Sequence, residues 1–386
     1  MRLWTHDFTR VYMSNLLLYA SLYMLLPVLP IYLVEHFNLS LSMAGVASAL
    51  FAVGLFIFGP FYSYLIDNFH RKTVCMLSYL VVIAILFGYT IISSLLWLIV
   101  LRIAQGALFG VATTMGSTLA IDISDTSRRS EANTSFCWAA KLGIVFGAMT
   151  GILIYRFAGL QEVLYAAVGA GVLGLLFISL THVAFRAPIG ASLFSLDRFF
   201  LPRGWIPALN LVLISSVFGL LLTSINMYTE SIPMQQVTVR YFSLLAGGFV
   251  LAMIANRIAF EKADFRAKVV SGLLLMSAAL LLMSTHIQYL ALMTAAVLMG
   301  LGIGLVSSDF LHIFIKLCEH CQRGTANTTY RFAWEVGVAI GVVVGCRLID
   351  TSSYISVFQV GLIAIILSLL FYFFITTPYF KSHRTH

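Results

Sequence analysis

The chain has 386 residues, of which 60% are hydrophobic and only 10% charged, against roughly 25% charged residues in an average soluble domain. Its 23 basic and 15 acidic residues are too few to cover a soluble protein of this length, so we exclude a soluble globular fold. The net charge of +8 does not indicate nucleic-acid binding, because the basic residues form no continuous stripe and fall in short loops. A polytopic membrane protein remains.

Twelve apolar runs of helical length predict an all-α membrane protein with twelve transmembrane helices. The runs lie at about 11–34, 44–65, 73–94, 96–121, 132–155, 162–183, 206–229, 241–260, 268–286, 289–315, 326–346 and 353–376. The interruption between the sixth and seventh runs is rich in Arg, Pro and Ser. We therefore predict an N-terminal six-helix half over 1–183, a cytoplasmic linker over 184–205 and a C-terminal six-helix half over 206–386.

The distribution of Lys and Arg predicts the orientation. Seventeen of these residues fall in loops on the side of the N-terminus, and three fall in loops on the opposite side: Arg156, Arg240 and Arg347. Cytoplasmic loops of membrane proteins carry an excess of Lys and Arg. Both termini are therefore predicted to lie in the cytoplasm, with the chain in an inner (cytoplasmic) membrane.

An internal repeat relates the two predicted halves. Residues 132–151 read ANTSFCWAAKLGIVFGAMTG and residues 326–345 read ANTTYRFAWEVGVAIGVVVG, with seven of the twenty positions identical. The same offset of 194 residues relates Gly106 to Gly300. Two halves that both start in the cytoplasm are parallel repeats, an architecture that places a central cavity near the bilayer midplane and opens it alternately by rocking.

Two short motifs resemble those of the major facilitator superfamily, and most nearly those of its drug and solute–proton antiporters. SYLIDNFHRK over 63–72 resembles the cytoplasmic signature G-x-L-x-D-R-x-G-R-R, in which Asp67, Arg71 and Lys72 match. LIVLRIAQG over 98–106 is similar to the R-x-x-Q-G pattern of the fourth span. The resemblance, with the twelve-span layout, covers the whole chain and implies a secondary transporter.

The fifth span departs from the drug-antiporter pattern G-P-x-x-G-G. It reads GAMTGI over 147–152, with no proline and no paired glycine. Two ladders of glycine remain, and we interpret them as surfaces for close helix packing. The ladders are Gly143, Gly147 and Gly151, and their copies Gly337, Gly341 and Gly345.

The resemblance implies roles for four of the charged residues. In the family, the loop arginine pairs with an acid at the cytoplasmic end of the fourth span, so we expect an Arg71–Asp122 ion pair that forms a conformational latch with Asp67. In exporters of the family, the arginine that matches Arg102 is associated with proton transfer. The alternative for Arg102 is a side chain that snorkels to the outer interface.

Other charges embedded in the spans are functional candidates by default, because a charge in the membrane interior is costly. Lys141 and Glu335 are repeat equivalents, each about ten residues from the cytoplasmic end of its span. Asp309 and Arg331 lie at a similar shallow depth and could pair, and Arg331 precedes Glu335 by one turn. We predict proton coupling by Arg102, Asp309, Arg331 and Glu335, since embedded carboxyl groups are reasonable proton carriers. A purely structural charge network is the alternative.

Polar side chains on the first and seventh spans predict a substrate site that includes Lys141. The first span presents Asn15, Tyr19 and Tyr23 at helical spacing, for which aromatic packing is the alternative. The seventh span adds Asn210 and Asn226. The N-terminal half has embedded cations and no embedded acid, which favours a substrate with an anionic or zwitterionic group.

We therefore predict a proton-coupled secondary active transporter that exports a small or amphipathic organic solute by alternating access. A proton-coupled nutrient-uptake symporter and a non-transporting receptor on the same fold remain alternatives. An enzyme is not expected, because the sequence has no clustered catalytic, metal-ligand or phosphate-loop residues. The expected partners are a small-molecule substrate, protons and the lipid bilayer, with no cofactor, metal or nucleic acid, and the expected state is a monomer.

Overall fold

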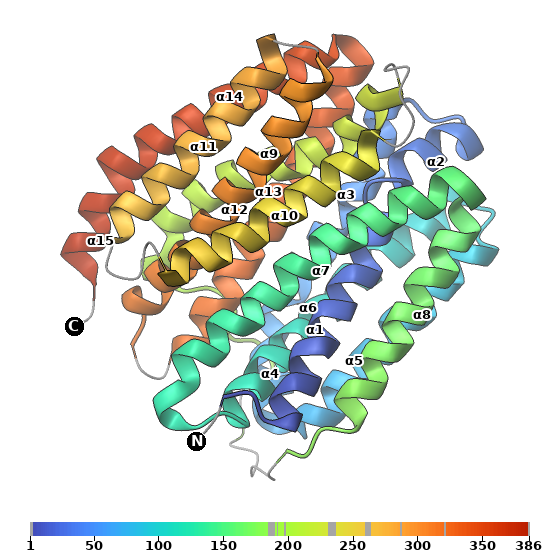
Figure 1. Cartoon of the computed structure of the whole chain (residues 1–386). Coiled ribbons are helices and arrows are strands. Elements are labelled where there is room, and N and C mark those ends of the chain that lie inside the picture. Colours follow the sequence, from blue (N-terminus) through green and yellow to red (C-terminus); the bar gives the residue numbers. More distant parts are fainter. Residues whose placement is uncertain are drawn as a thin grey trace. The chain divides into compact units, whose positions relative to one another are not determined.

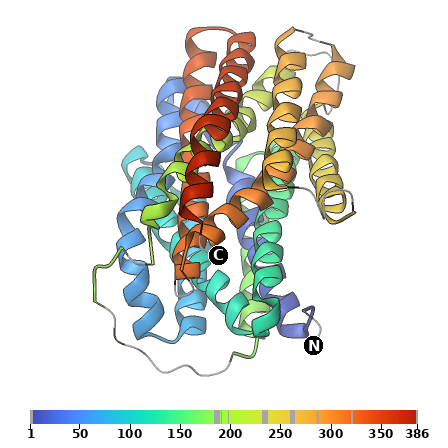
Figure 2. The same cartoon turned by 90° about the vertical axis from the view of Figure 1, so that its left-hand side faces the viewer.

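A computed structural model of the chain describes residues 3–183, 190, 192–196, 198–230, 237–258, 264–285, 288–319 and 322–384. These residues form helices and no strand (Figure 1, Figure 2). Within them, twelve helical segments are long and apolar enough to cross a membrane, and they follow the twelve predicted runs in order. The predicted all-α membrane fold with twelve spans is confirmed.

The helices before the linker are α1 (His6–Leu25), α2 (Leu29–Phe37), α3 (Leu41–Phe58), η1 (Gly59–Phe61), α4 (Tyr62–Asn68), α5 (Arg71–Gly88), η2 (Tyr89–Ile91), α6 (Leu95–Asp122), η3 (Thr126–Arg128), α7 (Arg129–Ala158) and α8 (Leu160–Ser179). After it come η4 (Pro202–Gly204), α9 (Trp205–Glu230), α10 (Val237–Ile258), α11 (Phe265–Thr285), α12 (Tyr289–Leu317), α13 (Arg323–Thr351), α14 (Tyr354–Phe371), the π-helical turn η6 (Tyr372–Thr376) and α15 (Thr377–His383).

Proline sets the interruptions in the first two spans. α1 ends at Leu25 and α2 begins at Leu29, on either side of Pro27. The second span changes into the 3₁₀ turn η1 at Gly59 and Pro60 before it continues as α4. Proline has no N–H group and its ring obstructs the preceding turn, so a regular helix cannot run through it without distortion.

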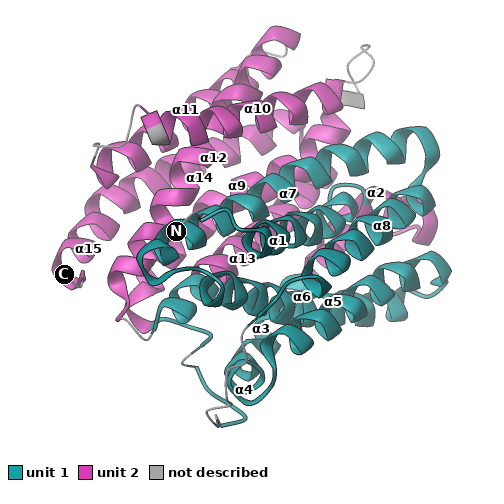
Figure 3. Cartoon of the chain, turned by 60° about the horizontal axis from the view of Figure 1, so that its bottom comes forward, with its two compact units in different colours: residues 1–28, 50–201, 321–329 teal, residues 29–49, 202–320, 330–386 magenta. Residues whose placement is uncertain are grey.

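The helices gather into two compact units, drawn in teal and magenta in Figure 3. Unit 1 consists of Met1–Val28, Leu50–Leu201 and Cys321–Thr329, and unit 2 consists of Leu29–Ala49, Pro202–His320 and Tyr330–His386. Each unit thus contains most of one predicted half and a short segment of the other: the beginning of α13 belongs to unit 1, and α2 with the first part of α3 belongs to unit 2. The functional division at 183 and 206 stays a prediction.

Equivalent glycines make equivalent contacts in the two units. In unit 1 the backbones of α3 and α6 touch at two glycines, and in unit 2 those of α10 and α12 do the same 194 residues later. At each of these positions a Cβ atom would collide with a carbonyl oxygen of the facing helix, so only glycine fits. The contacts are Gly54–Ile103 and Gly106–Phe51 in unit 1, and Gly248–Val297 and Gly300–Leu245 in unit 2.

The two predicted glycine ladders are packing surfaces, as expected. Gly143, Gly147 and Gly151 of α7 lie against the backbone of α1, and Gly337, Gly341 and Gly345 of α13 lie against α9. The repeat in the sequence is therefore also a repeat of helix contacts.

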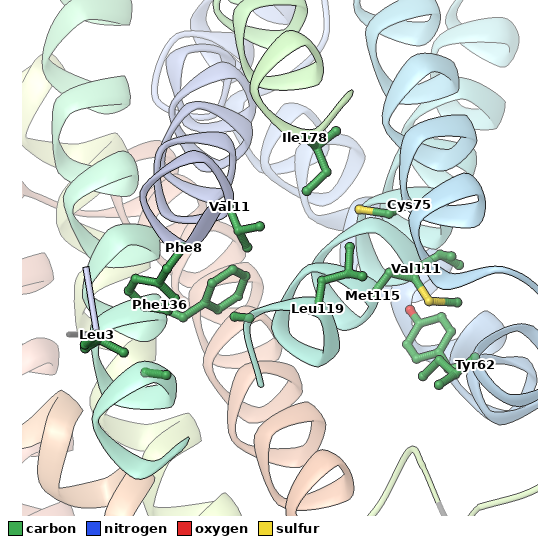
Figure 4. Packing of buried hydrophobic residues seen from close by; sticks show 13 residues of the cluster. Leu3, Phe8, Val11, Tyr62, Cys75, Val111, Met115, Leu119, Phe136 and Ile178 are labelled. Atoms are coloured by element: carbon green, nitrogen blue, oxygen red, sulfur yellow. The ribbon is translucent and has the colours of Figure 1, made fainter. Parts of the chain in front are cut away.

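A cluster of buried hydrophobic side chains in unit 1 supports the ends of its helices (Figure 4). Phe8 and Phe136 join α1 to α7, while Met115 and Leu119 of α6 continue the cluster toward α4 and α5 (Figure 4). Ile66, another member, directly precedes Asp67, and Leu119 lies one turn before Asp122. The core therefore holds in place the helix ends that carry these two acids.

Candidate functional site

Three charged residues meet where α4, α5 and α6 end. Arg71, the first residue of α5, places Nη1 2.5 Å from Asp122 Oδ2 and Nη2 3.6 Å from Asp67 Oδ1. All three side chains are largely buried, so solvent and salt screen their attraction less than they would at an open surface. The expected Arg71–Asp122 ion pair is confirmed, and its role as a latch stays a prediction.

The linker contributes a second arginine to this cluster. Arg198 Nη2 lies 3.0 Å from Asp67 Oδ1, so Asp67 is shared between two guanidinium groups. The end of the same linker is tied to the beginning of α13, where the Leu201 N–H donates to Thr329 Oγ1 at 2.8 Å. The ring of Phe199 lies against Gly59 of η1. The last linker residues are therefore held against unit 1 by side-chain and backbone contacts.

Arg102 forms a buried polar cluster on α6. Only 1% of the residue is exposed. Its Nη1 donates to Gln105 Oε1 at 2.8 Å, and the Tyr89 hydroxyl donates to the same oxygen at 2.9 Å. The guanidinium carbon also lies 5.6 Å from the centre of the Phe51 ring, within range of a cation–π contact. Arg102 therefore points into unit 1, and the alternative of a side chain that snorkels to the surface is wrong.

The polar stripe of α1 faces the interior of unit 1. Tyr19 and Tyr23 are stacked with ring centres 6.3 Å apart, and Tyr19 meets Phe109 of α6 edge-on at 4.9 Å. Asn15 Nδ2 donates to the Phe136 carbonyl of α7 at 2.9 Å. Tyr23 is also an electrostatic neighbour of Arg102. Tyr23, at one end of the stripe, thus lies near the Arg102 cluster, whereas Asn15 joins α1 to α7.

Lys141 and Glu335 are both buried, with exposed fractions of 5% and 4%. Lys141 lies in the middle of α7 and belongs to unit 1, whereas Glu335 lies on α13 and belongs to unit 2. Their predicted roles in substrate binding and proton coupling stay predictions.

Asp309 of α12 is almost fully buried beside a lysine that the sequence did not single out. Lys268 of α11 is its electrostatic neighbour, and Lys268 Nζ donates to Asn256 Oδ1 at 3.0 Å. Asn256 Nδ2 in turn donates to Ser308 Oγ at 2.8 Å. Pairing of Asp309 with Arg331 stays a prediction. The structure adds a polar connection from α11 through α10 to α12 in unit 2.

The two asparagines predicted on the seventh span are buried in unit 2. Asn210 bonds to Ser368 of α14 at 2.5 Å and to Thr376 of η6 at 3.1 Å. With its amide oxygen toward Thr376, it also accepts from the N–H of Tyr372, the first residue of the π-helical turn, at 3.3 Å. Asn210 thus joins α9 to α14, and substrate binding by Asn210 or Asn226 stays a prediction.

Comparison with protein families decides the class of the molecule. The family model described as Major Facilitator Superfamily matches residues 11–308. The chain belongs to the major facilitator superfamily. It is accordingly a multi-pass membrane transporter and not an enzyme, and the paired charges at Arg71 and Asp122 occupy the positions that the family motif predicts.

Two bacterial relatives of this major facilitator protein are transporters by name. The chain is 23% identical to the "Staphyloferrin B transporter" of Staphylococcus aureus over 404 residues, which covers 96% of this chain and 92% of that one. It is 25% identical over 158 residues to the "Multi-drug resistance efflux pump PmrA" of Streptococcus pneumoniae, which covers 40% of this chain and 38% of the pump.

Solved structures share the fold of this major facilitator protein at low sequence identity. The human organic anion transporter MFSD10 (TETRAN) matches with a TM-score of 0.71 and 18% identity over 95% of this chain and 98% of its own. An auto-inhibited POT family peptide transporter matches with a TM-score of 0.76 and 11% identity over 99% of this chain and 98% of its own. These likenesses establish the fold alone.

One hydrogen-bonded pair of this major facilitator protein was not predicted, although the repeat in the sequence pointed to both of its residues. Asn133 and Asn327, the asparagines of the repeated ANT tripeptide, donate reciprocally from Nδ2 to Oδ1 at 2.8 and 2.7 Å. Asn327 lies in the part of α13 that belongs to unit 1. The repetition of the tripeptide singled out both residues, but only the folded chain reveals that the two copies bind each other.

Proposed function

We propose that this major facilitator protein is a proton-coupled exporter of a small or amphipathic organic solute with an anionic or zwitterionic group. It would work by alternating access in an inner membrane with both termini in the cytoplasm. The naming of one relative as an efflux pump supports export. The cationic residues buried in unit 1, Arg102 and Lys141, support a substrate with negative charge.

The observation that carries the proposal is the burial of Arg102 with Gln105 and Tyr89 around one amide oxygen. A buried guanidinium group is costly to keep in a membrane protein and is a functional candidate for that reason. The same three-residue spacing of Arg and Gln is the R-x-x-Q-G motif that resembles the one in proton-coupled exporters. We assign Arg102 to proton coupling.

In this proposal, Lys141 binds the substrate and Glu335 exchanges a proton. Lys141 anchors the acidic group of the substrate, because an ammonium group in a low-dielectric interior attracts an anion strongly. Glu335, together with Asp309 and Arg331, takes up or releases a proton as the cavity opens and closes. Asp67, Arg71 and Asp122 act as a latch for one conformational state, and Tyr19 and Tyr23 line the substrate path.

Transport in inside-out vesicles tests the function. An acidic vesicle interior should drive accumulation of organic anions or zwitterions from a panel that also contains organic cations, and collapse of the pH gradient should abolish it. Arg102→Ala should lose the gradient-driven component at least 10-fold, with Ala296→Met, the repeat-equivalent position in unit 2, as the control. Accumulation of the solute only in right-side-out vesicles with an inward proton gradient would contradict export and indicate uptake.

Cysteine labelling tests the proposed orientation. Ser192 of the linker and Ser352 after α13 are both exposed. In intact cells, a membrane-impermeant thiol reagent should label a cysteine at Ser352 and leave one at Ser192 unlabelled until the cells are permeabilised. Labelling of Ser192→Cys from outside contradicts cytoplasmic termini.

A further inference from the structure

Gln105 has an unmet hydrogen-bond donor in the interior of unit 1. The residue has an exposed fraction of 0%. Among the described residues, none accepts a hydrogen bond from its Nε2 atom. Buried polar groups in proteins are nearly always hydrogen-bonded, so an exception calls for a partner that the chain itself does not supply.

The orientation of this amide follows from its neighbours. Arg102 Nη1 and the Tyr89 hydroxyl both donate to Gln105 Oε1, at 2.8 and 2.9 Å. A guanidinium group has no hydrogen-bond acceptor. If the amide oxygen and nitrogen of Gln105 were exchanged, the amide NH₂ group would therefore face the N–H donor of Arg102. The NH₂ group of Gln105 is therefore directed away from Arg102 and Tyr89 by their hydrogen bonds.

The surroundings of the cluster indicate what kind of partner fits. The positive charge of the Arg102 guanidinium group and a vacant N–H donor on the same helix favour an oxygen atom that carries negative charge. The nearby rings are aromatic: Phe51 lies against the guanidinium group, and Tyr23 is its electrostatic neighbour. Aromatic surfaces of this kind favour a flat apolar body behind the charged group.

The repeat supplies a reference for this cluster. The positions equivalent to Tyr89, Arg102 and Gln105 in unit 2 are Met283, Ala296 and Met299, all buried. Helix contacts at the neighbouring glycines are the same in both units. Close packing of these helices therefore does not require the polar cluster, and this favours a role for it in transport.

We propose that Gln105 Nε2, beside Arg102, receives an oxyanion of the transported solute, of the carboxylate or sulfonate class and carried on an aromatic or similarly flat apolar body. The inference rests on the proposed function for its substrate and adds a binding contact on α6 to the anchoring role of Lys141. Binding needs the cluster to become accessible, which alternating access provides.

Purified protein in detergent tests the contact with two probes, benzenesulfonate and its neutral analogue benzenesulfonamide. Ligand-induced shifts of the thermal unfolding midpoint, followed by tryptophan fluorescence, yield an apparent affinity for each. Wild-type protein should bind the sulfonate at least 10-fold more tightly than the sulfonamide. Gln105→Glu keeps an acceptor for Arg102 and Tyr89 but removes the donor, and Gln105→Met copies the residue in unit 2. Both should lose the preference, while Met299→Leu should keep it.

Several outcomes overturn the proposal. If both probes shift the unfolding midpoint of the wild-type protein equally, or neither does, Gln105 Nε2 does not receive an oxyanion and the donor is satisfied by water alone. A folded Gln105→Met protein that binds the sulfonate like wild type removes the contact as well. Vesicle transport separates the two hypotheses. Gln105-dependent binding without gradient-driven transport of the sulfonate contradicts the proposed function alone, and gradient-driven transport that is insensitive to Gln105→Met contradicts this inference alone.

Discussion

Unit 1 and unit 2 share their helix contacts at glycine but differ in the charged and polar side chains at equivalent positions. In unit 1, Arg71 and Asp122 form an ion pair, whereas the equivalent residues of unit 2 are Phe265 and Lys316, with the lysine Nζ 4.7 Å from the ring centre. The Arg102 cluster of unit 1 is replaced by buried alanine and methionine in unit 2. The glycines that bring the helices together are nevertheless present in both units.

The difference separates two requirements of the fold. Backbone contacts at glycine depend only on the absence of a side chain, so they recur wherever the helices must pack closely. Ion pairs and buried polar clusters are not needed for that packing, so each unit can carry its own. Within its spans, unit 1 buries the cations Arg102 and Lys141, whereas unit 2 buries the acids Asp309 and Glu335. Asp67, a buried acid of unit 1, lies near the end of α4 beside Arg71. In our proposal, Lys141 of unit 1 binds the anion, the acids of unit 2 exchange the proton, and Arg102 of unit 1 takes part in the proton coupling.

The opposite charges at the equivalent positions 141 and 335 provide the strongest test of that division. Lys141→Ala should abolish binding of the substrate found in the vesicle panel, with at least a 100-fold loss of affinity, because its cationic anchor is gone. Glu335→Gln should retain binding but lose its dependence on pH, because a neutral amide cannot exchange a proton. Binding of each variant at two pH values checks both statements. A folded Lys141→Ala protein that binds like wild type removes the anchoring role.

Transplanting the arginine tests whether unit 2 can host the cluster of unit 1. Ala296→Arg should destabilise the protein by at least about 2.5–3.5 kcal/mol, since the neighbouring methionines offer only weak acceptors for a guanidinium group. The yield of monodisperse protein in size-exclusion chromatography and the unfolding midpoint report the effect. Ala296→Met adds length without charge and controls for size. An Ala296→Arg protein as stable as wild type would mean that unit 2 already contains partners for this charge.

Two adjacent glycines on α10 test the shared packing. A Cβ at Gly248 would collide with the Val297 carbonyl, whereas a Cβ at Gly247 has no atom within 4 Å. Gly248→Ala should therefore cost about 1–3 kcal/mol through overpacking, and Gly54→Ala, its equivalent in unit 1, should cost a similar amount. Gly247→Ala should be neutral or slightly stabilising. The unfolding midpoints of the three variants, measured in the same detergent, test these expectations. Equal midpoints for Gly247→Ala and Gly248→Ala would contradict the assigned helix contacts.

The smallest expected effect is in the latch of unit 1. Asp67→Asn weakens the attraction to Arg71 and Arg198, which should slow transport several-fold and leave equilibrium substrate affinity within a few-fold, because it shifts a population and not the binding site. Initial rates and binding constants measured on the same preparation test this. Lys316→Ala, in the equivalent region of unit 2, should change the rate less than two-fold. Loss of binding in folded Asp67→Asn protein would place the loop in the substrate site.

The sequence alone supported the class of fold and one long-range ion pair. Apolar runs of about 20 residues predict spanning helices because a bilayer leaves no other partner for backbone N–H and C=O groups. The Arg71–Asp122 pair was predictable because a family motif links the two positions. Arg198 and Lys268 were not, since a basic residue in the linker or at the beginning of a span has many possible acidic neighbours and the sequence does not rank them.

Only the tertiary structure decided how the polar residues are used. The sequence placed Arg102 within a span but left open whether it reaches the surface or the interior, because a long flexible side chain can do either. Packing of α6 against α3 and α5 buries it against Gln105, Tyr89 and Phe51. Likewise, the repeated ANT tripeptide was visible in the sequence, but its pairing of Asn133 with Asn327 depends on helices that are 194 residues apart and meet only in the folded chain.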